Sequence, residues 1–260
     1  MLLLPLILSF LPSPDFATPA TDLRVLMVGN SYTAGTWQAF QEFAAADAQV
    51  SLTLQVATRG GWTTRDHYQN RQSLAYQNGS YSLLDLLQLE AWDYVVIQEQ
   101  STRPSQAYLG NVVERNQFKR GMLNLDTVIK REAPTAEVVY FQSWPRNYGN
   151  SYLQSYFSNE PAQMHQATAA AYAQAAAATG ADSVHVGTAW NYSMHQNPGL
   201  TLHKSDGSHP NAAGGYLAGA MFYAYLYDLN PVGNSFTAGL PAADVSWLQD
   251  LAYGAWQLLD

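Results

Sequence analysis

Two short polar segments, far apart in the chain, carry residue types that could cleave an ester. The first is Val28-Gly-Asn-Ser31, which ends an apolar run and precedes a stretch with helical character. Ligands of open α/β sheets bind beyond the carboxyl ends of the strands, and the N–H groups of a following helix favour negative charge there. Ser31 is therefore a candidate nucleophile. The same residues also suit a serine that merely caps the helix.

The second segment, Lys204-Ser-Asp-Gly-Ser-His-Pro-Asn211, lies near the other end of the chain. Asp206 and His209 stand three apart in it, and Pro210 suits the first position of a following helix. A nearby carboxylate can hold an imidazole in one tautomer, so that its other nitrogen accepts a proton from a serine. Taken alone, the segment would also suit a surface turn with Asx geometry.

Apolar periodicity predicts the elements that must position these residues. Short apolar runs indicate strands, and longer amphipathic or alanine-rich stretches indicate helices. The expected strands are 23–28, 50–57, 92–97, 137–141 and 183–186, and the expected helices are 36–48, 83–89, 115–131, 164–179, 211–229 and 242–259. Residues 142–161, rich in Tyr, Asn, Ser and Pro, are expected to form a long loop, and long loops of such folds are often functional. Strands that alternate with helices predict parallel βαβ units. We therefore expect one domain over residues 21–260, a three-layer α/β/α sandwich with a mostly parallel, five-stranded, flavodoxin-like sheet.

The two segments together resemble the sequence blocks of the SGNH/GDSL hydrolase superfamily. Gly29-Asn-Ser-Tyr-Thr33 is similar to its opening Gly-Asp-Ser block, with Asn30 where Asp is usual. Asp206-Gly-Ser-His209-Pro-Asn is similar to its closing Asp-x-x-His-Pro block. The resemblance implies a serine esterase in which Ser31 attacks, His209 is the base and Asp206 orients it. It implies no metal and no organic cofactor.

The resemblance also implies an oxyanion hole, which the superfamily builds from backbone N–H groups and an amide side chain. The N–H groups would come from Ser31 and from Gly61, because Gly61-Trp-Thr63 matches the superfamily's Gly-x-Thr. Gly60 is the alternative to Gly61, and a plain Gly-Gly turn explains the local sequence equally well.

The amide of this oxyanion hole is an Asn after the third strand in most of the superfamily. Here that block reads Val95-Val-Ile-Gln98-Glu-Gln-Ser101 and contains no Asn. A branch of the superfamily looks similar, with Gln in this block. Gln98 is the expected donor because its amide carries the same N–H groups, and Gln100 is the alternative.

Aromatic and cationic residues near the expected strand ends suggest how substrate is held. Arg59, Trp62 and Trp144, together with Trp190, could form a rim on which a sugar stacks, although aromatic residues are more often part of a core. His203 lies close to the Asp206 segment and could line the same site. We expect a small O-acyl ester, such as an acetyl ester, on a carbohydrate. A lipid or thioester hydrolase, an acyltransferase, and a glycan-binding protein without activity remain alternatives.

The amino-acid composition argues against some classes of binding partner and excludes some kinds of catalytic and metal site. The net charge is -8, only 12% of the 260 residues are charged, and no Lys/Arg cluster occurs, which argues against a nucleic-acid partner. The chain has no cysteine, so disulfides, thiolate metal sites and cysteine nucleophiles are excluded. The remaining histidines do not show metal-ligand spacing.

The N-terminus argues for export. Met1 to Leu11 is an apolar run too short to span a bilayer as a helix, and small residues at Thr18-Pro-Ala20 could form a cleavage site. Residues 1–20 are therefore predicted to be a signal peptide, and the protein to be secreted or periplasmic, although no Lys or Arg precedes the apolar run. A packed or disordered apolar N-terminus is the alternative. We predict no transmembrane segment in the rest of the chain.

Overall fold

The computed structural model describes residues 22–73, 76 and 80–259. The predicted signal peptide, residues 1–20, lies outside the described residues and stays a prediction. Within the part that is described, no helix is both long and apolar enough to cross a membrane.

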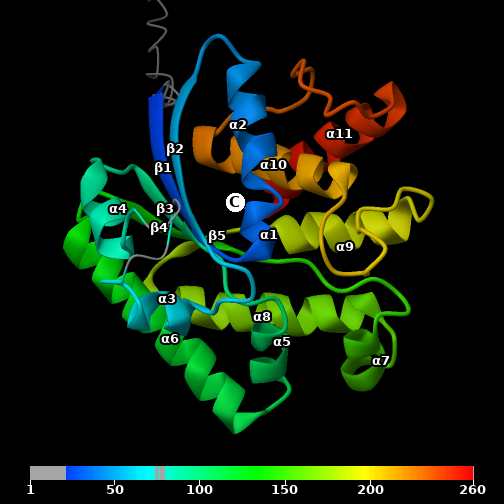
Figure 1. Ribbon diagram of the computed structural model, residues 1–260. Helices are drawn as coiled ribbons and strands as arrows, with labels where there is room; N and C mark the ends of the chain where they lie inside the picture. Colours follow the sequence, from blue (N-terminus) through cyan, green and yellow to red (C-terminus); the bar gives the residue numbers. More distant parts are fainter. Residues whose placement is uncertain (1–21, 74–75, 77–79, 260) are drawn as a thin grey trace, which may run out of the picture.

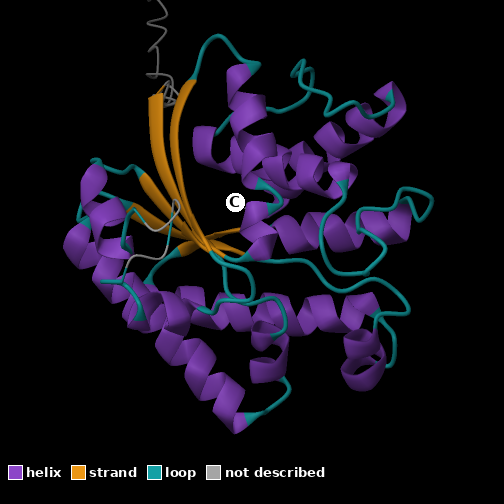
Figure 2. Ribbon diagram, viewed as in Figure 1, coloured by secondary structure: helices purple, strands orange, loops and turns teal. Residues whose placement is uncertain are grey.

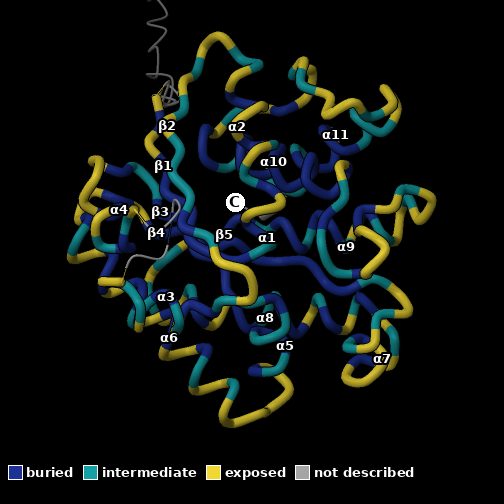
Figure 3. Tube along the Cα trace, in the orientation of Figure 1, coloured by how far each residue is buried: buried dark blue, intermediate teal, exposed yellow. Residues whose placement is uncertain are grey.

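Five parallel strands form the centre of the molecule, in the order β2-β1-β3-β4-β5. Their bounds are β1 (Asp22–Gly29), β2 (Ser51–Thr58), β3 (Tyr94–Ile97), β4 (Glu137–Phe141) and β5 (Asp182–Val184). The inner strands are apolar almost without interruption and buried on both sides, as parallel sheets require. The edge strand β2 is only half-buried, which Figure 3 shows along the trace.

Helices cover both faces of the sheet (Figures 1 and 2). One layer, with the nucleophile segment, contains α1 (Ser31–Ala34), α2 (Trp37–Ala45), α9 (Val186–Gln196), α10 (Ala212–Tyr227) and α11 (Ala242–Leu259). The opposite layer contains α3 (Thr64–Gln69), α4 (Leu83–Leu89), α5 (Arg103–Tyr108), α6 (Val112–Glu132) and α8 (Pro161–Thr179), and α7 (Ser151–Phe157) packs beside α8. The predicted three-layer α/β/α sandwich with a five-stranded parallel sheet is confirmed.

Helix α10 fixes the acid–base segment, because it begins directly after it. Asn211 caps the helix, accepting a hydrogen bond from the Gly214 N–H at 3.0 Å. Nearly every residue of α10 is buried, as expected for a helix that is apolar all round. At Gly219 an added Cβ would lie 2.7 Å from Ala39 of α2, so α10 and α2 pack at a distance that only glycine allows. His209 therefore projects from a rigid layer.

The sequence-based elements differ from the structure mainly at short helices that were not expected. The expected helix 36–48 is present as the shorter α2, and the separate short helix α1 before it was not expected. Helices α5 and α9 were also missed, and the expected strand 183–186 ends at Val184. The expected loop 142–161 contains helix α7. Helix α3 was missed because it is short, although a reciprocal capping box between Thr63 and Asp66 marks its start.

Candidate active site

Ser31, His209 and Asp206 form a hydrogen-bonded relay. His209 Nε2 lies 2.9 Å from Ser31 Oγ, and His209 Nδ1 lies 2.6 Å from Asp206 Oδ2. These are the contacts of a nucleophile, its base and the group that orients the base. With Nδ1–H donating to Asp206, Nε2 is left to accept the Ser31 proton. The fold thus brings together two segments that are 178 positions apart.

Ser31 occupies its position because β1 ends at Gly29 and a helix starts at once. Asn30 caps this helix, its Oδ1 accepting from the Tyr32 N–H at 3.1 Å. Ser31 is the first helical residue, so its own N–H has no partner within the helix. Ser31, the candidate nucleophile, therefore carries both a hydroxyl and a backbone donor at the carboxyl edge of the sheet.

The turn Asp206–His209 is organised by the carboxylate itself. Asp206 Oδ1 accepts from the N–H groups of Ser208 at 2.8 Å and of His209 at 2.9 Å, while Oδ2 faces the imidazole. Gly207 between them has φ +62°, which favours glycine. Desolvation works to raise the pKa of the Asp206 carboxyl, but the hydrogen bonds from His209 and Ser208 outweigh it and lower the pKa to about 2. The carboxylate stays ionised wherever the imidazole must act as a base.

The loop with Gly61 lies beside the nucleophile. The Arg59 N–H donates to the Gly29 carbonyl at 3.1 Å, and Asn30 Nδ2 donates to the Trp62 carbonyl at 3.0 Å. Gly61 is exposed with φ +72°, and an added Cβ there would meet nothing within 4 Å. Backbone conformation and not space is therefore the reason for glycine. That Ser31 and Gly61 donate to an oxyanion remains a prediction.

Gln98 requires a correction. Its side chain is fully buried under the nucleophile turn, where Oε1 accepts from the Asn30 N–H and the Thr33 hydroxyl, each at 3.1 Å. Its Nε2 donates to the Glu99 carbonyl. The Gln98 amide thus bonds to the turn Asn30–Thr33 from inside the protein and is not exposed to a substrate, contrary to the expected donor role. The alternative, Gln100, accepts with its side-chain oxygen from the first residues of α5.

Trp144 requires a second correction. It is fully buried between two rings, with centroids 4.2 Å from Tyr32 and 4.1 Å from Trp190. Its indole N–H donates to the Ser208 carbonyl at 2.9 Å. Because both faces are covered, neither Trp144 nor the equally buried Trp190 can stack on a sugar. Trp144 instead supports the turn that carries His209.

Arg59 and Trp62 keep the accessibility that substrate contact requires. The guanidinium of Arg59 lies 5.0 Å above the Trp62 ring, in cation–π contact. Arg59 is exposed, Trp62 is partly exposed, and both flank Gly61. They form an open edge next to Ser31, and their contact with substrate stays a prediction.

His203 lies close to the site but is turned away from its chemistry. It is buried, and its Nε2–H donates to the Pro145 carbonyl at 2.9 Å. Burial lowers its pKa to about 4, so the ring is neutral. In the part of the chain that the structure describes, no group of His, Cys, Asp or Glu could hold a metal ion.

Two charged residues near the site were missed by the sequence analysis. Glu99 is fully buried, and burial raises the pKa of its carboxyl to about 7 against hydrogen bonds from Thr64 and Gln100. Arg146, nine-tenths buried, follows β4 and contacts Tyr32 and Ser208. Only the length of the segment 142–161 pointed there, because long loops of such folds are often functional.

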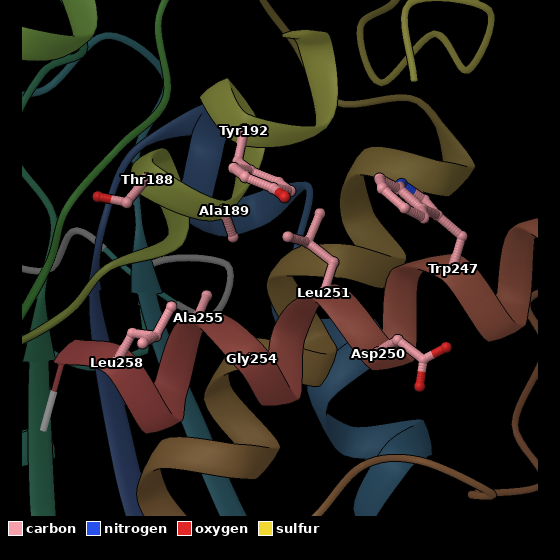
Figure 4. A pocket seen from close by; sticks show the side chains of 9 residues that line it. All are labelled: Thr188, Ala189, Tyr192, Trp247, Asp250, Leu251, Gly254, Ala255 and Leu258. Carbon is pink, nitrogen blue, oxygen red and sulfur yellow. The ribbon is translucent and has the colours of Figure 1, made fainter. Parts of the chain in front are cut away.

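An apolar pocket elsewhere does not belong to this site. It lies between α9 and α11, has a volume of about 350 Å³ and is lined by residues such as Tyr192, Trp247, Leu251 and Leu258 (Figure 4). No residue of the relay lines it.

Comparison with solved structures shows which proteins share this fold. A DUF4886 family protein from Bacteroides uniformis is 21% identical over 90% of this chain and 94% of its own, with a TM-score of 0.78. A candidate SGNH hydrolase from Slackia heliotrinireducens is 27% identical over 78% of this chain and 97% of its own, with a TM-score of 0.59. An acetylxylan esterase from Geobacillus stearothermophilus, solved as a catalytic mutant, is 14% identical over 83% and 98%, with a TM-score of 0.55. Neither the protein-family models nor the curated proteins contain a match to the chain.

Proposed function

We propose that this chain, which shares the fold of SGNH hydrolase structures and carries both sequence blocks, is a serine esterase of the SGNH/GDSL type acting on small O-acyl esters of a carbohydrate. The observation that carries the proposal is the relay from Asp206 through His209 to Ser31, with both contacts at hydrogen-bond length. Fold alone would not identify the chemistry, whereas this geometry can perform it.

The mechanism follows from the relay. His209 Nε2 takes the proton from Ser31 Oγ as the oxygen attacks the ester carbonyl carbon. The N–H groups of Ser31 and Gly61 would stabilise the resulting oxyanion, as donors aimed at developing charge do. The C–O bond to the alcohol then breaks, and His209 gives its proton to the leaving oxygen. Water, activated by the same imidazole, hydrolyses the acyl-enzyme and frees the acid and Ser31.

The substrate class rests on more limited support. The side chains of His209 and Asp206 are 38% and 47% exposed, so the relay is open enough for a bulky alcohol portion. Arg59 and Trp62 offer an aromatic and cationic edge to a sugar. One protein of the same fold is an acetylxylan esterase, which agrees with an acetyl group on a glycan. Export is proposed from the sequence of residues 1–20.

The test is hydrolysis of p-nitrophenyl esters from acetate to octanoate by the wild type and by Ser31→Ala. We expect activity that falls with chain length and disappears in the variant. Labelling of Ser31 by a fluorophosphonate should be lost in Ser31→Ala. Rates that rise with chain length would favour a lipid hydrolase, and absence of both labelling and turnover would show a binding protein. Release of acetate from acetylated xylan then tests the carbohydrate.

A further inference from the structure

A buried guanidinium joins the two halves of the relay. We infer that Arg146 is a positioning residue, which holds the Asp206–His209 turn in register with the nucleophile. The inference rests on the proposed function and adds to it a residue that neither sequence block contains.

Arg146 contacts three separate segments at once, the segment after β3, helix α1 and the Asp206–His209 turn. Its Nη2 donates to Ser101 Oγ at 2.9 Å, in the segment after β3. Its Nη1 donates to the Tyr32 hydroxyl, next to the nucleophile, and to Ser208 Oγ, next to the base. The Tyr32 and Ser208 oxygens are themselves 3.2 Å apart. One planar group therefore fixes the residues adjacent to Ser31 and to His209 against each other.

The environment of Arg146 is unusual for a buried cation. Only 9% of the residue is exposed, and no carboxylate of the described residues lies within ion-pair distance of it. Burying an unpaired charge is costly, so such a group marks a place where the charge or its geometry is required. Burial lowers the pKa of Arg146 to about 10, and the electrostatic interactions with Tyr152 and with the Asp206 carboxylate work in the opposite direction. The guanidinium remains charged at neutral pH.

The backbone around Arg146 holds the rest of the same turn. The Asn147 N–H donates to the Gly207 carbonyl at 2.9 Å, and Asn150 Nδ2 donates to the Asp206 carbonyl at 3.0 Å. With the bond from Trp144 to Ser208, the segment after β4 binds three successive residues of the turn. These contacts fix the turn to the segment 144–150, and the Arg146 side chain extends this hold to the nucleophile helix.

Loss of this link should affect the reaction and not the binding of substrate. A misplacement of about 1 Å can reduce a rate by about 10². We expect Arg146→Ala to lower kcat for p-nitrophenyl acetate by about 10- to 100-fold and to change KM by less than about threefold. Added guanidinium ion, at concentrations below those that unfold the protein, should restore part of kcat, and equal urea should not.

The matched control is Arg71→Ala. The Arg146 guanidinium lies 5.5 Å above the Tyr32 ring, and that of Arg71 lies 4.5 Å above the Tyr68 ring. Arg71 donates to the Tyr68 carbonyl and does not contact the relay. The variant Arg71→Ala should leave kcat unchanged. A second arm uses Ser208→Ala and Tyr32→Phe, which remove single partners of Arg146 and should each lower kcat less than Arg146→Ala, with non-additive effects in the double variants.

Two results would overturn the inference while the proposed function stands. One is a wild-type kcat in folded Arg146→Ala. The other is a loss that follows only the fraction unfolded in thermal melts and that guanidinium does not restore. If the wild type itself neither turns over esters nor reacts with a fluorophosphonate, the proposed function fails and this inference fails with it.

Discussion

The ring of Tyr32 stacks on the indole of Trp144 with 4.2 Å between centroids and only 4° between planes. Tyr32 follows the proposed nucleophile Ser31, and the Trp144 indole N–H donates to the carbonyl of Ser208, next to the proposed base His209. The stack therefore spans the same junction that Arg146 spans with hydrogen bonds. The ring stack and the hydrogen bonds of Arg146 together support the 2.9 Å contact between Ser31 Oγ and His209 Nε2, two residues that are 178 positions apart in the chain.

Trp144→Ala should unfold the protein more easily and inactivate it. Removing a fully buried Trp typically costs about 3–5 kcal/mol, because the cavity loses contacts on both faces of the ring. Trp144→Phe keeps the stack and loses the bond to Ser208, so its loss of stability should be about 1–2 kcal/mol. Urea denaturation, followed by far-ultraviolet circular dichroism because tryptophan fluorescence would change with the substitution, measures the stability of both variants. Equal stability of the two variants would contradict the role of the stack.

Glu99→Gln should change how stability depends on pH. Burial raises the pKa of the Glu99 carboxyl from 4.5 to about 7. Below pH 4.5 the Glu99 carboxyl is protonated in both the folded and the unfolded protein. Above pH 4.5 the unfolded chain releases this proton while the folded protein keeps it. The free energy of unfolding therefore falls as the pH rises from 4.5 to about 7, and this loss is complete above pH 7. The total loss is about 3 kcal/mol, at 1.36 kcal/mol per pKa unit. Gln imitates the neutral acid, so the variant should lack this loss.

Free energies of unfolding from urea titrations at pH 5 and pH 8 decide the matter. We compare the free energy of unfolding of the wild type with that of Glu99→Gln at each pH. This difference should be more unfavourable for the wild type at pH 8 than at pH 5. The same pH dependence in both proteins would show that Glu99 does not carry it.

Gln98→Ala should destabilise the fold as well as slow the reaction. Its side-chain oxygen is the buried acceptor for the Asn30 N–H and the Thr33 hydroxyl, and each donor left without a partner costs about 1–3 kcal/mol. A pure oxyanion donor would behave differently, with a rate loss of about 10²–10³ and unchanged stability. Thermal unfolding and kcat measured on the same sample separate the two roles.

Gly61→Ala and Gly60→Ala form a matched pair at the proposed oxyanion loop. Gly61 has φ +72°, where a side chain costs about 1–2 kcal/mol, whereas Gly60 lies outside the left-handed region and has open space for a Cβ. Gly61→Ala should lower kcat by about tenfold or more as its N–H is displaced. Gly60→Ala should stay near the wild type. The opposite order would assign the donor to Gly60.

Patterns that depend only on residues close together in the sequence could be recognised from the sequence. Alternating apolar runs and helical stretches predicted the parallel sheet, because backbone periodicity is a local property. The short helices α1, α3, α5 and α7 were missed because a short helix depends on its tertiary neighbours more than on its own propensity.

The five strands in their chain order, the longer helices and the two segments that form the relay could be read from the sequence alone. Ser31 and the Asp206–His209 turn were identifiable because strand ends and turn residues are local signals, and parallel strands collect their carboxyl ends at one edge. Only the tertiary structure decided which side chains face substrate and which are buried. Burial depends on what packs against a residue from distant parts of the chain. For that reason Trp144 and Gln98 support the site from within, and Arg146 links its halves.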